Sequence, residues 1–266
     1  MSGYETIELD ATPGGVAVIL LNRPESGNAL TLQMVEEISD ALENLRSEEQ
    51  LRMVLIRGAG NDFCIGADRH WYELAQGYTK EENEQDGFAV AEMFRKLYEL
   101  PQLTVTMVQG AVLGGGVGLV AASDVVIARE DAHFCFGEVS RGMIPAAVAP
   151  YVMKAIAPRL AKGLFLTGES FDASYAEQAG LVQYVVDDEK GMEDMLEYLS
   201  SLAFANSPSA VADAKRLFHA LEDEAISKDT SHKTAKHAAL RWERGEAQEG
   251  IAALLEDRKP GWADRS

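Results

Sequence analysis

The residues best suited to chemistry stand in two turns that are rich in small side chains. One turn belongs to the stretch AVLGGGVGLVAASD, residues 111–124, where four glycines fill five positions. The other is the GAD turn, residues 66–68, within GNDFCIGADRHWYELA. Each turn follows an apolar run and precedes a segment expected to be helical. The first turn of a helix carries unpartnered backbone N–H groups and a partial positive charge, so it suits a developing anion.

The spacing of the glycines excludes two nucleotide-binding motifs. A dinucleotide fingerprint that uses Gly114 and Gly116 would need its third glycine at Leu119, and the Gly-Lys-Ser/Thr of a phosphate loop is absent. The remaining interpretations are an oxyanion site at a helix that opens near Val117, or close helix packing without a ligand. The N–H of Ala67 in the second turn favours the oxyanion site, because two backbone donors from two strand ends suit an enolate oxygen.

The elements that must position these turns are apolar strands that alternate with helices. This pattern predicts a mainly parallel sheet with helices on both faces. A Pro-Gly-Gly turn, residues 13–15, predicts an antiparallel hairpin at the start, and Thr31 is expected to cap the first amphipathic helix. The expected strands are residues 4–9, 16–21, 51–58, 103–110 and 124–129, and the expected helices of this part are residues 31–46 and 87–100.

From about Pro145 onward the pattern is almost entirely helical. Ser207 and Pro208 predict one helix start, as the cap and the first helical residue. We expect an α/β core over residues 1–195 and a helical C-terminal region over residues 196–266, which packs on the core or on another subunit. The helical segments of this half are residues 146–168, 174–180, 191–204, 207–225 and 232–258.

The composition narrows the class of protein. The 266 residues carry 24 Lys and Arg against 43 Asp and Glu, a formal net charge of -19, which disfavours binding to nucleic acid or to an anionic membrane. The apolar runs are shorter than a membrane span and the first residues lack the features of a signal peptide, so we expect a cytoplasmic protein. Cys64 and Cys135 are expected to be buried thiols. His232 and His237 face different sides of a helix, and no metal site is expected.

The sequence resembles the crotonase superfamily, also called enoyl-CoA hydratase/isomerase. The motifs that carry the resemblance follow the family's order over practically the whole chain. They are LNRPESGNAL, FCIGAD, QGAVLGGGVGLVAASDVVIA, AHFCFGEVSRGMIPA, LTGESFDASYAEQAGLVQYVV and LLEDRKPGW. The segment FGEVSRGMIPAAVAPYVMKAIAPR is most similar to bacterial methylglutaconyl-CoA hydratases of leucine degradation.

The resemblance implies a fold and a ligand. The fold is the ClpP-like crotonase type of the α/β class, a spiral of ββα units with a helical C-terminal region that assembles a trimer or a dimer of trimers. The ligand is an acyl-CoA thioester, in which coenzyme A is part of the substrate, and no cofactor is bound permanently.

The resemblance also implies roles for single residues. The two N–H groups that hold the thioester carbonyl match Ala67 and Gly115. Of the two glutamates that hydratases use, the second matches Glu138, whereas the first falls on Gly118, which has no side chain. The usual mechanism of hydration by two carboxylates therefore does not carry over unchanged. Family members that use a carboxylate eight positions after the second glutamate are disfavoured, because Ala146 stands there.

Glu138 is the central candidate for catalysis on its own sequence context as well. It lies between an apolar run and a glycine-containing turn, so we expect partial burial, a raised pKa and acid–base chemistry, with a structural ion pair as the alternative. The leading hypothesis is hydration of a branched or carboxylated enoyl-CoA such as 3-methylglutaconyl-CoA. The alternatives are a Δ3,Δ2-enoyl-CoA isomerase or glutaconyl-type decarboxylase, and an inactive acyl-CoA-binding subunit.

The remaining candidates are expected around the substrate. Asp68 suits the cap of the following helix. Arg69 and Arg141 each either pair with a second carboxylate on the substrate or stay solvated. A lone histidine such as His70 is more often structural than a proton donor. The candidates for substrate binding are Asn28, Ala29, Asp68, Arg69, His70, Gly114 and Arg141.

Overall fold

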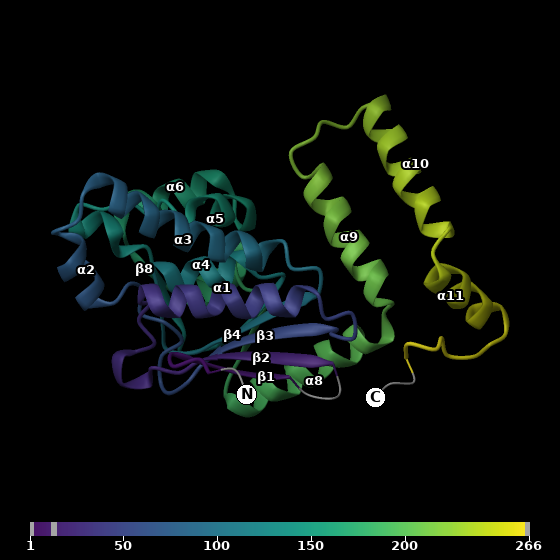
Figure 1. The fold of residues 1–266 in the computed structure, drawn as a ribbon, viewed down its shortest axis with the longest axis horizontal. Helices are drawn as coiled ribbons and strands as arrows, with labels where there is room; N and C mark the ends of the chain where they lie inside the picture. Colours follow the sequence, from purple (N-terminus) through teal and green to yellow (C-terminus); the bar gives the residue numbers. More distant parts are fainter. Residues whose placement is uncertain (1–2, 12–14, 264–266) are drawn as a thin grey trace.

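The fold of this computed structural model, which describes residues 3–11 and 15–263, is built on a six-stranded sheet (Figure 1). Its strands are β1 (Ile7–Ala11), β2 (Val16–Leu21), β3 (Met53–Gly58), β4 (Leu103–Val108), β6 (Val125–Arg129) and β9 (Tyr184–Val186). β1 pairs antiparallel with β2, and the remaining neighbours pair parallel in the order given. The predicted hairpin and parallel sheet are confirmed, while residues 12–14 of the predicted turn lie outside the described residues.

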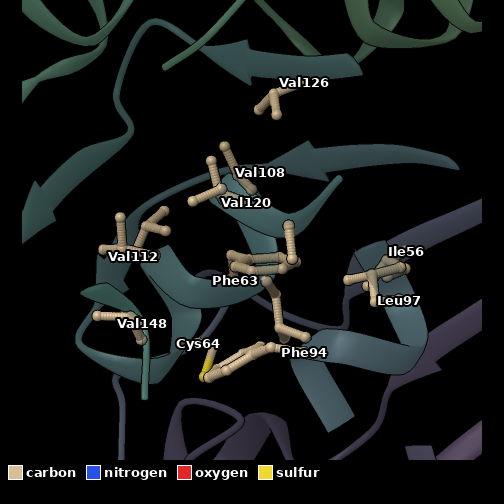
Figure 2. Packing of buried hydrophobic residues seen from close by; sticks show 14 of the residues in the cluster. Ile56, Phe63, Cys64, Phe94, Leu97, Val108, Val112, Val120, Val126 and Val148 are labelled. Atoms are coloured by element: carbon tan, nitrogen blue, oxygen red, sulfur yellow. The ribbon is translucent and has the colours of Figure 1, made fainter. Parts of the chain in front are cut away.

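Helices lie on both faces of this sheet, as the apolar strands predicted. Helices α1 (Leu32–Arg46), α3 (Lys80–Tyr98) and α4 (Gly115–Ala122) lie on one face, and α8 (Glu189–Ala205) lies on the other (Figure 1). Side chains alternate along a strand, so Val54 of β3 joins the large core cluster, whereas its neighbour Met53 joins a second cluster with Met192 of α8. Figure 2 shows part of the large cluster.

A second, three-stranded sheet carries the candidate site. Its strands are β5 (Ala111–Leu113), β7 (His133–Cys135) and β8 (Ser170–Asp172). β5 pairs parallel with β7, and β7 pairs antiparallel with β8. Three residues are too few to show a periodic pattern, so the sequence indicated only the apolar run around β7. The parallel pair is important for function, because the segments that follow β5 and β7 emerge at the same edge.

Capping residues set the helix starts. The Thr31 side chain accepts a hydrogen bond from the Met34 N–H at 3.1 Å, which confirms the predicted cap of α1. Helix α3 begins at Lys80, well before the predicted start at residue 87, because Thr79 and Glu82 form a capping box. The first turns of α3 are charged and exposed, so they carry no apolar periodicity for a sequence pattern to detect.

The helical segment predicted over residues 146–168 is two helices. These are α5 (Ala149–Ala155) and α6 (Pro158–Thr167), and Pro158 starts the second because it lacks the N–H that a continuous helix needs there. The short elements are η1 (Pro24–Ser26), α2 (Arg69–Ala75), η2 (Gly137–Arg141) and α7 (Ala173–Ala179).

A C-terminal arm projects from the core (Figure 1). It consists of α9 (Pro208–Leu221), α10 (Lys228–Trp242) and α11 (Gly245–Leu255). Ser207 caps α9 as predicted, whereas the segment expected as one helix over residues 232–258 is interrupted at Arg244. The boundary proposed at residue 195 falls inside α8. No helix of the described chain is both long and apolar enough to cross a membrane.

Candidate active site

The two glycine-containing turns lie against each other beside the small sheet. Cys64 forms a parallel bridge with Val112, and the Leu113 N–H donates to the Cys64 carbonyl at 2.8 Å. A Cβ atom placed on Gly66 would lie 3.1 Å from the Leu113 carbonyl oxygen and 3.9 Å from the Gly114 Cα. Both glycines have positive φ, which other residues rarely adopt. The bare backbone therefore allows the two turns to meet.

The predicted oxyanion donors, the N–H groups of Ala67 and Gly115, have no acceptor within the described chain. The backbone of Leu30 forms hydrogen bonds with Gly66 and Asp68, the two neighbours of Ala67, and leaves the Ala67 N–H free. The Leu30 N–H donates to the Gly66 carbonyl, and the Asp68 N–H donates to the Leu30 carbonyl, both at 2.8 Å. Gly115 is the first residue of α4, which opens slightly earlier than predicted, and a first-turn N–H has no partner inside its helix.

Glu138 stands in η2, directly after β7, and reaches the glycine turn after the neighbouring β5. Its Oε1 lies 2.8 Å from the place of a Cβ on Gly114. Its Oε2 is buried and has no hydrogen-bond partner among the described residues. Burial raises the pKa of Glu138, while a backbone hydrogen bond and the charge of Arg141 act in the opposite direction. A desolvated carboxyl with a free oxygen is suited to exchange protons with a ligand.

Gly118, which the resemblance matches to the first of two glutamates, is covered by apolar side chains. A Cβ placed on Gly118 would lie 2.4 Å from Phe94 Cζ and 2.6 Å from Val148 Cγ1. Phe94 belongs to α3 and Val148 precedes α5, and both are buried. The described structure therefore holds two apolar groups where a second carboxylate would begin.

Asn28 and Ala29, two of the predicted substrate-binding residues, contact the protein's own chain. Asn28 is fully buried with φ of 52°, and its amide donates to the carbonyls of Ala59 and Asp62 at 2.8 and 2.9 Å. The Ala29 carbonyl accepts from the Arg23 guanidinium at 2.6 Å. These bonds fix the loop that leads into Leu30 and thus support the GAD turn.

Asp68 is confirmed as a helix cap. Its carboxylate accepts from the His70 N–H at 2.8 Å and from the Arg23 guanidinium at 3.0 Å. Despite the opposing effect of burial, these bonds hold the pKa of Asp68 below its usual value. Asp68 therefore stays charged and anchors α2 next to Ala67.

The remaining candidates, Arg69, His70 and Arg141, have exposed side chains. Arg69 is 92% exposed and pairs with Glu73, which also contacts the His70 ring. Arg141 is exposed and donates to the Gly137 carbonyl at 3.2 Å, one helical turn from Glu138. None of these side chains is buried, so each is accessible to a ligand that approaches the turns.

Sequence reasoning missed four residues of the site. Arg23 and Leu30 were quoted within a motif but given no role, and Phe94 and Val148 were not singled out. The apolar pattern of the α3 segment marks Phe94 as a core position, but only the packing shows that it faces Gly118. Among the described residues no group of three or more His, Cys, Asp and Glu side chains is arranged to hold a metal ion.

Comparison with known proteins identifies the architecture as the crotonase fold. A Pseudomonas aeruginosa protein named AtuE is 36% identical with a TM-score of 0.94, over 98% of this chain and 100% of that chain. An enoyl-CoA hydratase from Shewanella pealeana is 33% identical with a TM-score of 0.93, over 98% and 97%. A mevalonyl-coenzyme A hydratase of Aspergillus fumigatus is 32% identical over 93% of this chain and 91% of its own. The sequence model of the enoyl-CoA hydratase/isomerase family matches residues 11–265, and the chain belongs to this family of enzymes.

Proposed function

We propose that this protein is an acyl-CoA hydratase, which adds water to the double bond of an enoyl-CoA thioester. The single observation that carries the proposal is the buried, unpartnered Oε2 of Glu138 beside the turn that bears Gly115. A carboxyl group without an internal partner costs stability, and its retention next to two free N–H donors favours a catalytic use.

The reaction follows from these groups. The N–H groups of Ala67 and Gly115 donate to the thioester oxygen and stabilise the enolate that forms on it. The Glu138 carboxylate accepts a proton from water as the water oxygen bonds to the β carbon. The electron pair of the double bond moves into the enolate. The same proton then passes from Glu138 to the α carbon, which restores the carboxylate and leaves the 3-hydroxyacyl-CoA.

A branched or carboxylated acyl group, such as that of 3-methylglutaconyl-CoA, is the proposed substrate. Arg69 and Arg141 support this, because a protein with a net charge of -19 must bind an anionic acyl group through local cations. The similarity to a mevalonyl-coenzyme A hydratase agrees with a polar, branched acyl chain.

A second candidate is a Δ3,Δ2-enoyl-CoA isomerase or a glutaconyl-type decarboxylase. The apolar contacts at Gly118 favour it, because these reactions need one carboxylate or fewer and no second group to hold water. The third alternative, an inactive acyl-CoA-binding subunit, is disfavoured because Glu138 is retained.

Substrates that differ in acyl structure distinguish these functions. The purified protein is incubated with crotonyl-CoA, 3-methylglutaconyl-CoA and a Δ3-enoyl-CoA, and the products are identified by mass and by the absorbance of the conjugated thioester. We expect a gain of one water on 3-methylglutaconyl-CoA. A gain of conjugation from the Δ3 substrate would favour the isomerase, and loss of carbon dioxide would favour the decarboxylase. No turnover of any substrate would contradict the first two candidates.

We further propose that the protein acts in the cytoplasm as a homotrimer or a dimer of trimers. Its two cysteines are free thiols, which a reducing compartment maintains. No residue of α9 or α10 is buried, and the arm exposes large apolar side chains that a second copy of the chain would cover.

A further inference from the structure

Gly118 of α4 lies one helical turn after Gly114, the residue that directly precedes the helix. The Gly118 N–H donates to the Gly114 carbonyl at 3.2 Å, so the two positions lie on one face of the helix. Cα–Cβ bonds in a helix tilt toward its N-terminus, so a side chain at position 118 would lean toward Gly114. Glu138 Oε1 lies 2.8 Å from the place of a Cβ on Gly114, so Gly118 is one helical turn from a neighbour of the Glu138 carboxyl.

The space for that side chain is occupied by Phe94 and Val148. Both are labelled in Figure 2 among the packed apolar residues, and neither is accessible to solvent to any large extent. Contacts of 2.4 and 2.6 Å to a single Cβ are far shorter than van der Waals distance, so even alanine does not fit without displacement.

Phe94 also contacts a row of aromatic side chains. Its ring packs edge-on against Tyr151 at 5.9 Å between centroids, and Tyr151 packs edge-on against Tyr98 at 5.4 Å. The Tyr98 hydroxyl donates to the carboxylate of Glu222 at 2.7 Å. Glu222 directly follows the last residue of α9. This row of aromatic rings gives Phe94 little freedom to turn away from Gly118.

We infer that Phe94, together with Val148, is the positioning residue that restricts this active site to one carboxylate. Glu138 is then the carboxylate that holds water in the site, and the side chains at the Gly118 position are apolar. This inference rests on the proposed function insofar as Glu138 exchanges the proton. The packing that it describes does not depend on that function, so the two can be tested separately.

The packing is tested by measuring how far one added methyl group at position 118 lowers the melting temperature. Gly118→Ala is made in the parent and in Phe94→Ala, Val148→Ala and Leu97→Ala proteins, and the melting temperature of each is measured. We expect a fall of several degrees in the parent, and at most half that fall when Phe94 or Val148 is shortened. Leu97, which is also buried on α3, is the matched control and should leave the fall unchanged. An equal fall in melting temperature on Gly118→Ala in all four proteins would overturn the inference.

The functional consequence is tested by installing the second carboxylate. Phe94→Ala/Gly118→Glu is compared with Phe94→Ala/Gly118→Gln in the hydration of crotonyl-CoA over a range of pH. Two neighbouring carboxyls titrate as a coupled pair, so the Glu protein should show an additional ionisation in kcat/KM and at least tenfold faster hydration at its optimum. Identical profiles for the two folded proteins would contradict the assigned role. Inactivity of the parent enzyme on every enoyl-CoA would contradict the proposed function and leave the packing result standing.

Discussion

The carboxyl group of Glu138 occupies the space that a side chain on Gly114 would need. Glu138 Oε1 lies 2.8 Å from the place of a Cβ on Gly114, and the Cα of Gly66 lies 3.9 Å from the same place. Position 114 therefore requires glycine for two separate reasons. It has φ of 49°, and it leaves room for the carboxyl group beside the first N–H of α4.

The first prediction concerns this contact. Gly114→Ala should destabilise the fold by about 1 kcal/mol or more through the positive φ, and should lower turnover by about two orders of magnitude because the methyl group displaces Glu138. Melting curves and steady-state kinetics measure the two effects. Gly87→Ala, at an exposed position of α3 with no atom within 4 Å of the new Cβ, is the control and should stabilise the fold slightly with unchanged kinetics. Normal turnover in Gly114→Ala would remove this contact from the mechanism.

The sequence predicted the parts of this site that depend on local pattern. Glycines after an apolar run indicated a helix start with free donors, and Thr31 and Ser207 indicated caps that the structure confirms. The same local rules located Glu138 between an apolar run and a glycine turn. Each of these features is determined by the few residues around it, so it can be predicted from a single sequence.

The parts that the sequence did not predict depend on contacts between distant segments. The pairing of β5 with β7 brings Glu138 to Gly114, and neither strand is long enough to show alternation. Phe94 and Gly118 come from different helices, and their contact follows from how closely α3 approaches α4. Helix breaks at Pro158 and Arg244 depended on single residues within longer apolar patterns.

The second prediction concerns the pH dependence of Glu138. Because burial raises its pKa above the ordinary 4.5, the folded protein retains the proton at pH values where the unfolded chain has lost it. The charged Glu138 carboxylate therefore lowers the stability of the fold at pH values above its pKa in the folded protein. Below about pH 4.5 Glu138 is protonated in both states and has no such effect. Glu138→Gln should raise the melting temperature at pH 8, and this gain should disappear as the pH falls toward 4.5.

The same substitution should remove activity. Turnover should fall by about two orders of magnitude or more with little change in thioester binding, because the amide cannot accept the proton. In the parent, the acidic limb of kcat/KM should lie above the usual glutamate range. A stability difference that is constant with pH, or near-normal turnover in Glu138→Gln, would contradict the assignment of a desolvated acid–base group.

The third prediction concerns Asn28. Its amide oxygen accepts from the backbone N–H of Arg23 at 2.9 Å, and its amide nitrogen donates to two carbonyls, so Asn28→Ala leaves three partly buried backbone groups without these partners. We expect a loss of about 3 kcal/mol in the free energy of unfolding, measured in urea. Exposed Asn44, which bonds to Asp40, is the control, and Asn44→Ala should change stability by less than about 0.5 kcal/mol. Equal effects of the two substitutions would refute the supporting role of Asn28.

The fourth prediction concerns the C-terminal arm. Trp242 is 64% exposed and Leu254 is 70% exposed, an unfavourable state for large apolar groups on helices that bury few residues against their own core. If copies of the chain cover the arm, Trp242→Glu with Leu254→Glu should convert the assembly to monomers at micromolar concentration, because two charges would be buried at the contact. Sedimentation velocity gives the mass directly.

Phe88→Glu changes a similarly exposed aromatic residue on core helix α3 and should preserve the assembly. A monomeric parent would refute the proposed oligomer, and dissociation by Phe88→Glu alone would place the interface on the core rather than on the arm.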